Sequence, residues 1–239
     1  MSLPIPSLTA ALVIALVAVP ALASASPIRT ATWQMDEVPR ATVMHDSTGS
    51  HDGTIAPDAA SVGLTTNGSY YSWADRCPTC LPVQNSRIVR VPDTADGALD
   101  IPDPTMTYTL EFRFRTTKPS GNYMQKGQST SKGGQIKIQG PKGHVQCLFK
   151  GANGVRVGTG SASIAPLNDG SWHTVKCIHT ATQVLEYVDG LKVATKNGST
   201  GLIDNGAPFT VGGKLNCDQV TITCDYFQGD IAYITVSHG

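Results

Sequence analysis

Apolar and polar residues alternate along much of the chain with the two-residue period of a half-buried β-strand. The clearest case is Thr107–Thr116, where Leu110, Phe112 and Phe114 lie on one face and charged residues lie on the other. No segment longer than a turn or two has the period of a helix. The pattern therefore predicts an all-β protein with one face of each strand directed to the core.

Three consecutive strands are predicted near the C-terminal end of the chain. They are Trp172–His179, Val184–Val188 and Leu191–Ala194, and Asp189-Gly190 separates the last two. An Asp-Gly pair between β-prone runs favours a type I′ turn, which needs positive φ at both central residues. This stretch is typical of an antiparallel β-meander.

Composition supports the same class of fold. Only three of the 18 acidic residues are Glu, and aspartate favours turns and loops where glutamate favours helices. Further strands are expected at Ala31–Met35, Arg87–Val91, Asn122–Lys126, Gln135–Gln139, His144–Lys150, Phe209–Gly213 and Tyr226–Ser237. All-β sandwiches of about 200–250 residues commonly form a single domain, and no linker divides this chain.

The first 25 residues differ from the rest. Residues 8–19 form an apolar run, and Ala23-Ser24-Ala25 has the small-x-small pattern of a cleavage site. The run is short of the roughly 20 residues that a membrane-spanning helix needs, so an uncleaved anchor is the less favoured alternative. We expect residues 1–25 to be a signal peptide and residues 26–239 to form one secreted domain without membrane insertion.

Charge and cysteine content narrow the classes of partner. The formal net charge is zero and no basic stripe is present, which argues against nucleic acid and against electrostatic docking on membranes. Six cysteines fit an oxidising compartment. The spacing Cys77-Pro-Thr-Cys80 favours a local disulfide over half a zinc site or a redox pair, because no helix and no second close pair is predicted.

One proline-rich stretch holds four aspartates, Asp93, Asp96, Asp100 and Asp103. Flexible Asp-rich segments supply the oxygen ligands that Ca²⁺ takes, but this spacing matches no EF-hand loop. A solvated surface loop is therefore the favoured interpretation.

Two groups of side chains are candidates for ligand contact. Tyr70, Tyr71 and Trp73 form an aromatic cluster in a turn-rich segment and could stack on a sugar ring. Glu111 and Arg113 lie on the polar face of the clearest strand. The alternatives are a small loop core for the aromatic residues and a solvated face of paired charges for the strand.

A family resemblance rests on several of these segments together. W-H-T-V, L-E-Y-V-D-G-L-K-V, F-T-V-G-G-K and D-Y-F-Q-G-D-I-A-Y-I-T-V, with Trp33, Asp36 and Glu37 near the start, resemble the laminin-G-like, concanavalin A-like lectin/glucanase jelly roll. The resemblance covers roughly residues 29–237. It implies a two-sheet antiparallel jelly-roll sandwich.

The family topology also implies a pairing for the cysteines. It places Cys147 and Cys177 on neighbouring strands of one sheet, and it places the last two cysteines on either side of a hairpin connection. The implied disulfides are Cys77–Cys80, Cys147–Cys177 and Cys217–Cys224.

The same jelly roll carries glycoside hydrolases, so the fold leaves catalysis open. Those enzymes typically place their carboxylates on one strand as E-x-D-x-E or E-x-D-x-x-E, and this chain has only Glu37, Glu111 and Glu186. His173 and His179 share a strand face with core residues and are interpreted as packing histidines. No catalytic residue is predicted.

Many members of the family bind Ca²⁺ through an aspartate in a G-x-I-D-Y pattern of the last strand. Ala232 stands at that position here, in G-D-I-A-Y, so no cofactor is expected. Asp36 and Asp230 are the candidate ligands if a cation binds.

The residues and the resemblance together predict a secreted, non-catalytic module that binds an extracellular glycan or a protein surface. The alternatives are a divergent glycoside hydrolase with a rebuilt acid/base pair and a purely structural or inhibitory secreted protein.

Overall fold

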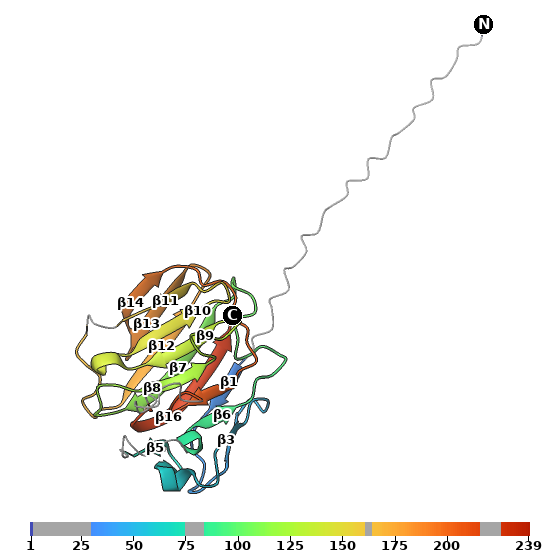
Figure 1. Cartoon of the computed structure of the whole chain (residues 1–239). Coiled ribbons are helices and arrows are strands. Elements are labelled where there is room, and N and C mark those ends of the chain that lie inside the picture. The colour runs from blue at the N-terminus through green and yellow to red at the C-terminus, as the bar shows by residue number, and fades with distance from the viewer. Residues whose placement is uncertain (2–29, 75–83, 161–163, 216–225) are drawn as a thin grey trace.

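The computed structural model describes Met1 and residues 30–74, 84–160, 164–215 and 226–239. These residues form two antiparallel β-sheets packed face to face, and their helical segments are short 3-10 turns (Figure 1). The turns are η1 (Ala59–Val62), η2 (Gln84–Arg87) and η3 (Pro141–Gly143). The predicted all-β jelly-roll sandwich is confirmed. In the described part of the chain, no helix combines the length and the apolar character needed to cross a membrane.

The first sheet is built around the C-terminal strand β16, which lies beside the N-terminal β1 in Figure 1. β16 pairs with β7 on one side and with β5 and then β1 on the other. In spatial order the strands are β14 (Leu191–Asn197), β13 (Gln183–Val188), β12 (His173–His179), β7 (Tyr108–Arg115), β16 (Gly229–His238), β5 (Tyr71–Trp73) and β4 (Leu64–Thr66), with β1 (Thr30–Trp33) beside β16.

The second sheet covers the inner face of the first. Its spatial order is β11 (Arg156–Gly158), β10 (Gln146–Lys150), β9 (Gln135–Gln139), β8 (Asn122–Lys126), β15 (Phe209–Val211), β6 (Val89–Val91), β3 (Gly53–Thr54) and β2 (Val43–Met44). Every pairing between these strands is antiparallel.

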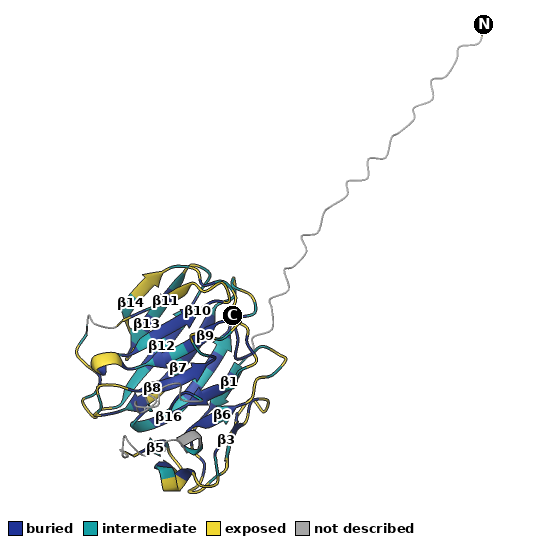
Figure 2. Ribbon diagram, in the orientation of Figure 1, coloured by how far each residue is buried: buried dark blue, intermediate teal, exposed yellow. Residues whose placement is uncertain are grey.

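Strand alternation builds the core as expected. Phe112 and Phe114 of β7 are fully buried, and Trp33 of the first sheet stacks on Phe209 of the second with ring centroids 5.8 Å apart. Burial of a large apolar side chain contributes about 1.5–3 kcal/mol, so such contacts hold the sheets together. Figure 2 shows the buried interior in dark blue and the edge strand β14 as largely exposed.

The predicted hairpin is confirmed in detail. Asp189 has a φ of 49° and Gly190 a φ of 81°, so both central residues of the turn are left-handed as a type I′ turn requires. Asp189 also accepts a hydrogen bond from the backbone of Thr174 at 2.8 Å. The turn between β13 and β14 is thereby tied to the start of β12.

The bridge between Cys147 and Cys177 forms, with Cα atoms 5.7 Å apart and both residues fully buried. The expectation that its cysteines lie in one sheet is wrong. Cys147 is in β10 of the second sheet and Cys177 is in β12 of the first, so the disulfide crosses the core. The other two predicted pairs, Cys77–Cys80 and Cys217–Cys224, lie outside the described residues, as does the predicted signal peptide apart from Met1.

The Asp-rich loop is tied to the fold through a buried lysine. The Lys126 ammonium has no exposed area and lies 2.5 Å from Asp93 Oδ1 and 3.2 Å from Asp100 Oδ2. It also donates to the backbone carbonyls of Asn205 and Ala207. The interpretation of a solvated loop is therefore wrong for Asp100, which is 2% exposed and holds the loop against β8.

Candidate ligand-binding face

Half of the side chains of the first sheet point away from the core and form a polar surface, which we call the outer face. Lys176 of β12 is opposite Glu111 of β7, and Thr174 is opposite Arg113. On the other side of β7, Tyr233 of β16 is opposite Arg113. The outer face comprises Glu111, Arg113, Arg115, Thr174, Lys176, Ile178, Tyr187, Asp230 and Tyr233.

A hollow of about 410 Å³ opens on this face. It is lined by Glu111, Thr174, Lys176, Ile178, Tyr187 and Gly190. Its lining residue Glu111 lies 2.8 Å from the Lys176 ammonium and accepts a hydrogen bond from the Tyr233 hydroxyl at 2.9 Å. Burial, followed by the hydrogen bond to Glu111, raises the pKa of Tyr233, so its hydroxyl keeps its proton. The hollow therefore offers fixed donors and acceptors beside an apolar side chain.

Arginine and aromatic side chains pack together next to the hollow. Arg115 lies over the rings of Trp172 and Tyr70, with its guanidinium carbon 4.7 Å and 5.1 Å from the two centroids. Trp172 and Tyr70 meet edge to face at 5.6 Å. The Arg115 Nε is 2.6 Å from Asp230 Oδ2, and this hydrogen bond raises the pKa of Arg115. The group, which we call the aromatic–arginine cluster, joins β7, β16 and the segments before β5 and β12.

Arg113, an exposed residue, also contacts this cluster. Its guanidinium carbon lies 5.1 Å from the Trp172 ring centroid, which is within the range of a cation–π contact. It forms no hydrogen bond or ion pair with any other residue that the structure describes. Its donors therefore face solvent on a side chain that the indole ring holds in place.

His173 ties two turns together at the end of the outer face. Its ring nitrogens lie 2.8 Å from Asp189 Oδ2 and 3.2 Å from Asp169 Oδ1. Burial alone would lower the pKa of His173, but the hydrogen bonds and charges of Asp189 and Asp169 outweigh it and raise the pKa. The two contacts of His173 thus connect the loops that border Trp172.

Replacing His173 with Gln should make the contribution of these contacts visible through its pH dependence. A raised folded-state pKa adds stability that is complete below the unfolded value of 6.5 and is lost as pH rises through the folded value. We expect His173→Gln to lower the free energy of unfolding by under about 1 kcal/mol at about pH 5.5 and to change little at about pH 9. Urea unfolding at both pH values checks this, and an equal loss at both would contradict it.

The predicted ligand contacts divide into two sets. Tyr70, Glu111 and Arg113 come together on or beside the outer face. The assignment of Tyr71 and Trp73 as contacts is wrong, because their segment is the strand β5 and both side chains point into the core with 0% and 1% exposure. The Tyr71 hydroxyl donates to Glu37, and the Trp73 indole donates to the Arg87 carbonyl.

Sequence reasoning missed Trp172, Arg115, Lys176 and Tyr233 as members of the site. The alternation in β12 could have identified Lys176, since it shares a face with Thr174. No local signal marks Trp172, which reaches the cluster through the pairing of β12 with β7.

The two candidate cation ligands lie in different parts of the structure. Asp230 is engaged by Arg115, and Asp36 is exposed on the segment after β1. Within the described residues, no group of three or more His, Cys, Asp or Glu side chains could hold a metal ion.

The glutamates lie apart from one another. Glu111 points outward from the first sheet, whereas Glu186, opposite the buried Cys177, points into the core and is fully buried. Glu37 accepts hydrogen bonds from the Tyr71 hydroxyl and the His45 backbone. Burial lowers the pKa of His179 to about 4, so this histidine is neutral as a packing residue would be. Glu111 and Glu186, on opposite faces of the first sheet, therefore do not form one acid/base pair across a glycosidic bond.

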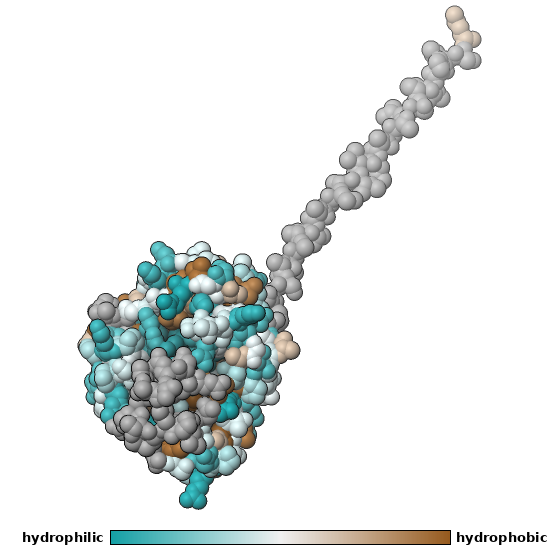
Figure 3. All heavy atoms as spheres, in the orientation of Figure 1, coloured by the Kyte–Doolittle hydropathy of each residue, from teal (hydrophilic) through white to brown (hydrophobic). Residues whose placement is uncertain are grey.

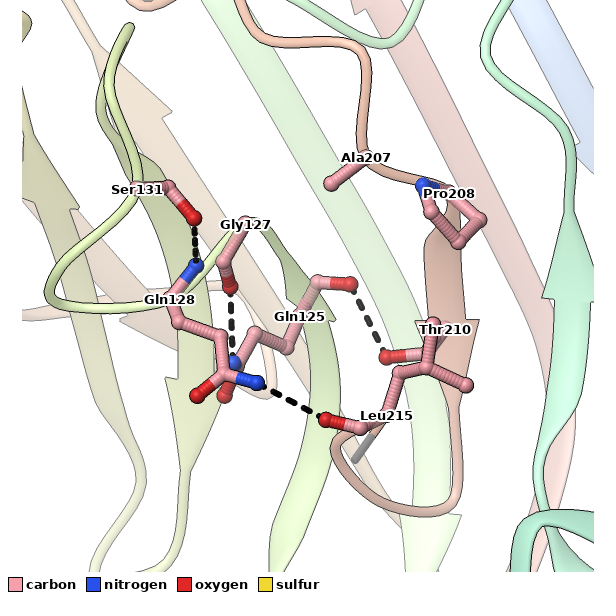
Figure 4. Close-up of a pocket in the computed structure, with 8 residues that line it drawn as sticks. All are labelled: Gln125, Gly127, Gln128, Ser131, Ala207, Pro208, Thr210 and Leu215. Atoms are coloured by element: carbon pink, nitrogen blue, oxygen red, sulfur yellow. Dashed lines mark hydrogen bonds between the residues drawn. The ribbon is translucent and has the colours of Figure 1, made fainter. Parts of the chain in front are cut away.

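A second, smaller hollow of about 200 Å³ lies between β8, β15 and neighbouring loops (Figure 4). Its polar groups bind one another. Gln125 Nε2 donates to the Gly127 carbonyl at 2.7 Å, and Gln128 Nε2 donates to the Leu215 carbonyl at 2.8 Å. The outer face, with the free donors of Arg113, is the better candidate for ligand binding.

Comparison with known families matches residues 114–239, just over half of the chain, to the Laminin G domain. No curated protein matches the chain.

One solved structure supports the same fold, and two others align over about half of this chain. The binding domain of Paraclostridial Mosquitocidal Protein 1 aligns at a TM-score of 0.55 and 11% identity over 88% of this chain and 47% of that one. Domains LG4-5 of the mouse laminin alpha1 chain align at a TM-score of 0.45 and 21% identity over 56% of this chain. A Ruminococcus gnavus sialidase carbohydrate-binding module, solved with alpha2,3 sialyllactose, aligns at a TM-score of 0.44 and 14% identity over 55% of this chain and 75% of that one.

This chain covers 36% of the solved chain that holds laminin alpha1 domains LG4-5. The family match and the two-sheet architecture agree over the C-terminal half of the molecule, which holds β8 to β16 and most of the outer face. The chain belongs to the laminin G domain family.

Proposed function

We propose that this chain is a non-catalytic binding module that recognises an extracellular carbohydrate on its outer face. The observation that carries the proposal is the outer face itself. Charged and aromatic side chains of β7, β12, β13 and β16 lie together on it, and residues of β7, β12 and β13 line an open hollow.

Carbohydrate fits this surface better than a protein partner does. Sugar hydroxyls both donate and accept hydrogen bonds, and the hollow presents the carboxylate of Glu111 beside the ammonium of Lys176. Protein interfaces are depleted of charged residues at their centre, whereas charges lie at the centre of the outer face. Polar residues also prevail over the described part of the surface shown in Figure 3, where apolar residues are scattered.

Two observations support a location outside the cell. The buried disulfide between Cys147 and Cys177 is typical of proteins folded in an oxidising compartment. The apolar run at residues 8–19 and the following small residues have the pattern of a signal peptide.

A glycan array probed with the purified protein, with and without EDTA, tests this function. We expect binding to at least one saccharide class, unchanged by EDTA because the proposed contacts include no metal ion. Binding to no saccharide, loss of binding in EDTA or hydrolysis of a bound polysaccharide would each contradict the proposal.

A double substitution then tests whether the glycan binds on the outer face. Replacing Glu111 and Lys176 by Ala removes a hydrogen-bonding acceptor and donor together, and we expect affinity for the captured glycan to fall about tenfold. The fold should lose at most about 1 kcal/mol, because the pair is partly exposed. Lys132→Ala, an exposed lysine outside the face, is the control. Equal binding by all three proteins would show that the site lies elsewhere.

A further inference from the structure

We infer that the saccharide bound at the outer face carries a carboxylate, as a uronic or sialic acid does, and that Arg113 binds this carboxylate. The inference rests on the proposed function, since it names the class of sugar that the same face would take.

Two of the three positively charged side chains named here on the outer face are in ion pairs with described residues, and Arg113 is not. Lys176 is paired with Glu111 at 2.8 Å, and Arg115 is paired with Asp230 at 2.6 Å. Arg113 has no such partner among the described residues, and it lies between the two pairs on β7. Among the described residues, the part of the face around Arg113 therefore carries an uncompensated positive charge, which favours an anionic group on the ligand.

The Arg113 side chain is also held in place before a ligand arrives. Its guanidinium lies over the Trp172 ring, and Trp172 is fixed in turn by Tyr70 at 5.6 Å and by Arg115 at 4.7 Å. A planar guanidinium offers parallel N–H donors that match the two oxygens of a carboxylate. Because the indole ring restricts the side chain, less conformational entropy is lost when these bonds form.

Groups beside Arg113 suit the rest of a sugar ring. Thr174 and Tyr233 are its partners on the two neighbouring strands, so a hydroxyl-bearing side chain lies on each side of the guanidinium. Both are half-buried and fixed to sheet strands. A carboxylate on Arg113 would thus bring the ring hydroxyls of a uronate over the hollow that Thr174 and Glu111 line.

Calorimetric titration with defined oligosaccharides tests the inference. The probes are oligogalacturonate, alginate, hyaluronan and sialyllactose oligosaccharides, together with the methyl esters of the same compounds, a sulfated oligosaccharide, neutral maltotriose and an acidic peptide. We expect at least one carboxylated saccharide to bind and its methyl ester to bind at least about tenfold more weakly, because the ester loses the charge.

Two substitutions of Arg113 separate its charge from its shape. Arg113→Gln should raise the Kd of the carboxylated saccharide by about 10–100-fold, and Arg113→Lys by about tenfold, because lysine keeps the charge without the paired donors. Arg156→Gln, the same change at an exposed residue of β11, should leave the Kd unchanged. Arg113 is exposed, so these variants should fold, and unfolding curves confirm it.

Each other outcome overturns the inference in a distinguishable way. Equal binding of acid and ester, or preference for maltotriose, would refute carboxylate recognition and leave glycan binding intact. Tighter binding of the sulfated sugar or the acidic peptide would refute the class of ligand. Unchanged affinity of Arg113→Gln would refute the role of Arg113, and binding of no saccharide would refute the proposed function as well.

Discussion

Lys126→Met is expected to lower the free energy of unfolding by about 3–5 kcal/mol, because it strips a buried carboxylate of its counter-charge. The Lys126 ammonium is fully buried, with Asp93, Asp100 and two backbone carbonyls around it. Met has a similar volume but cannot neutralise Asp100, which is 2% exposed. Lys132→Met, at an exposed lysine without a contact to this network, should be near neutral.

The pH dependence of this loss identifies its cause. Burial raises the pKa of Asp100 to about 6 even in the presence of Lys126. An acid with a raised folded-state pKa takes up a proton on folding, so its protonated form favours the folded state and stability falls as pH rises from the unfolded value through the folded one. Without Lys126 this pKa should rise further, so the Lys126→Met loss should be smaller at about pH 5 than at about pH 8.

A second variant distinguishes charge from packing. Lys126→Met combined with Asp100→Asn removes both buried charges and should recover most of the loss seen in Lys126→Met alone. Urea unfolding of all four proteins at both pH values gives the comparison. A Lys126→Met protein as stable as Lys132→Met would contradict the assignment of a buried ion pair to this position.

Removal of the inter-sheet disulfide should cost about 3–4 kcal/mol, since it closes a loop across a sequence separation of 30 residues and chain entropy scales with that loop. The bridge joins β10 to β12 across the core. Its loss removes the link between these two segments in the unfolded chain and so raises the entropy of that chain. The test is the double variant Cys147→Ala with Cys177→Val, which keeps the buried site apolar and leaves no unpaired thiol there.

Substitution is preferable to reducing agents, because a reductant would also act on the four other cysteines of the chain. The measurement is the midpoint and slope of urea unfolding, compared with the unaltered protein. A midpoint that does not change would show that the bridge contributes nothing to stability. A changed slope would locate part of the effect in the unfolded state.

The fold was predictable because its signals are local. Alternation in β7 and the Asp189-Gly190 turn depend on neighbours along the chain, and the structure confirms both. The sheet to which each strand belongs depends on long-range pairing. That is why the prediction pairs Cys147 with Cys177 correctly but assigns both to one sheet, whereas their strands face each other across the core.

The candidate site was predictable only in part, for the same reason. Tyr71 and Trp73 are two residues apart, which puts them on one strand face, and only the pairing of β5 with β16 and β4 decides that this face is the core. Arg113 was found from the polar face of its own strand. Trp172, which holds Arg113 in place, comes from a distant segment that strand register alone brings to it.

The fold and the proposed function meet in strand β7. Its inward side supplies Phe112 and Phe114 to the core, and its outward side supplies Glu111, Arg113 and Arg115 to the outer face. A rigid strand at the centre of a sheet thus fixes the spacing of the binding groups, which favours precise recognition over an adaptable contact.

The most direct test of the central claim is an amide-resolved NMR titration of the isotope-labelled protein with the saccharide that the array selects. Binding at the outer face predicts shifts concentrated at residues 111–115, 172–176 and 233, together with the Trp172 indole N–H. Shifts confined to the second sheet, or an unperturbed spectrum with every saccharide of the array, would contradict it.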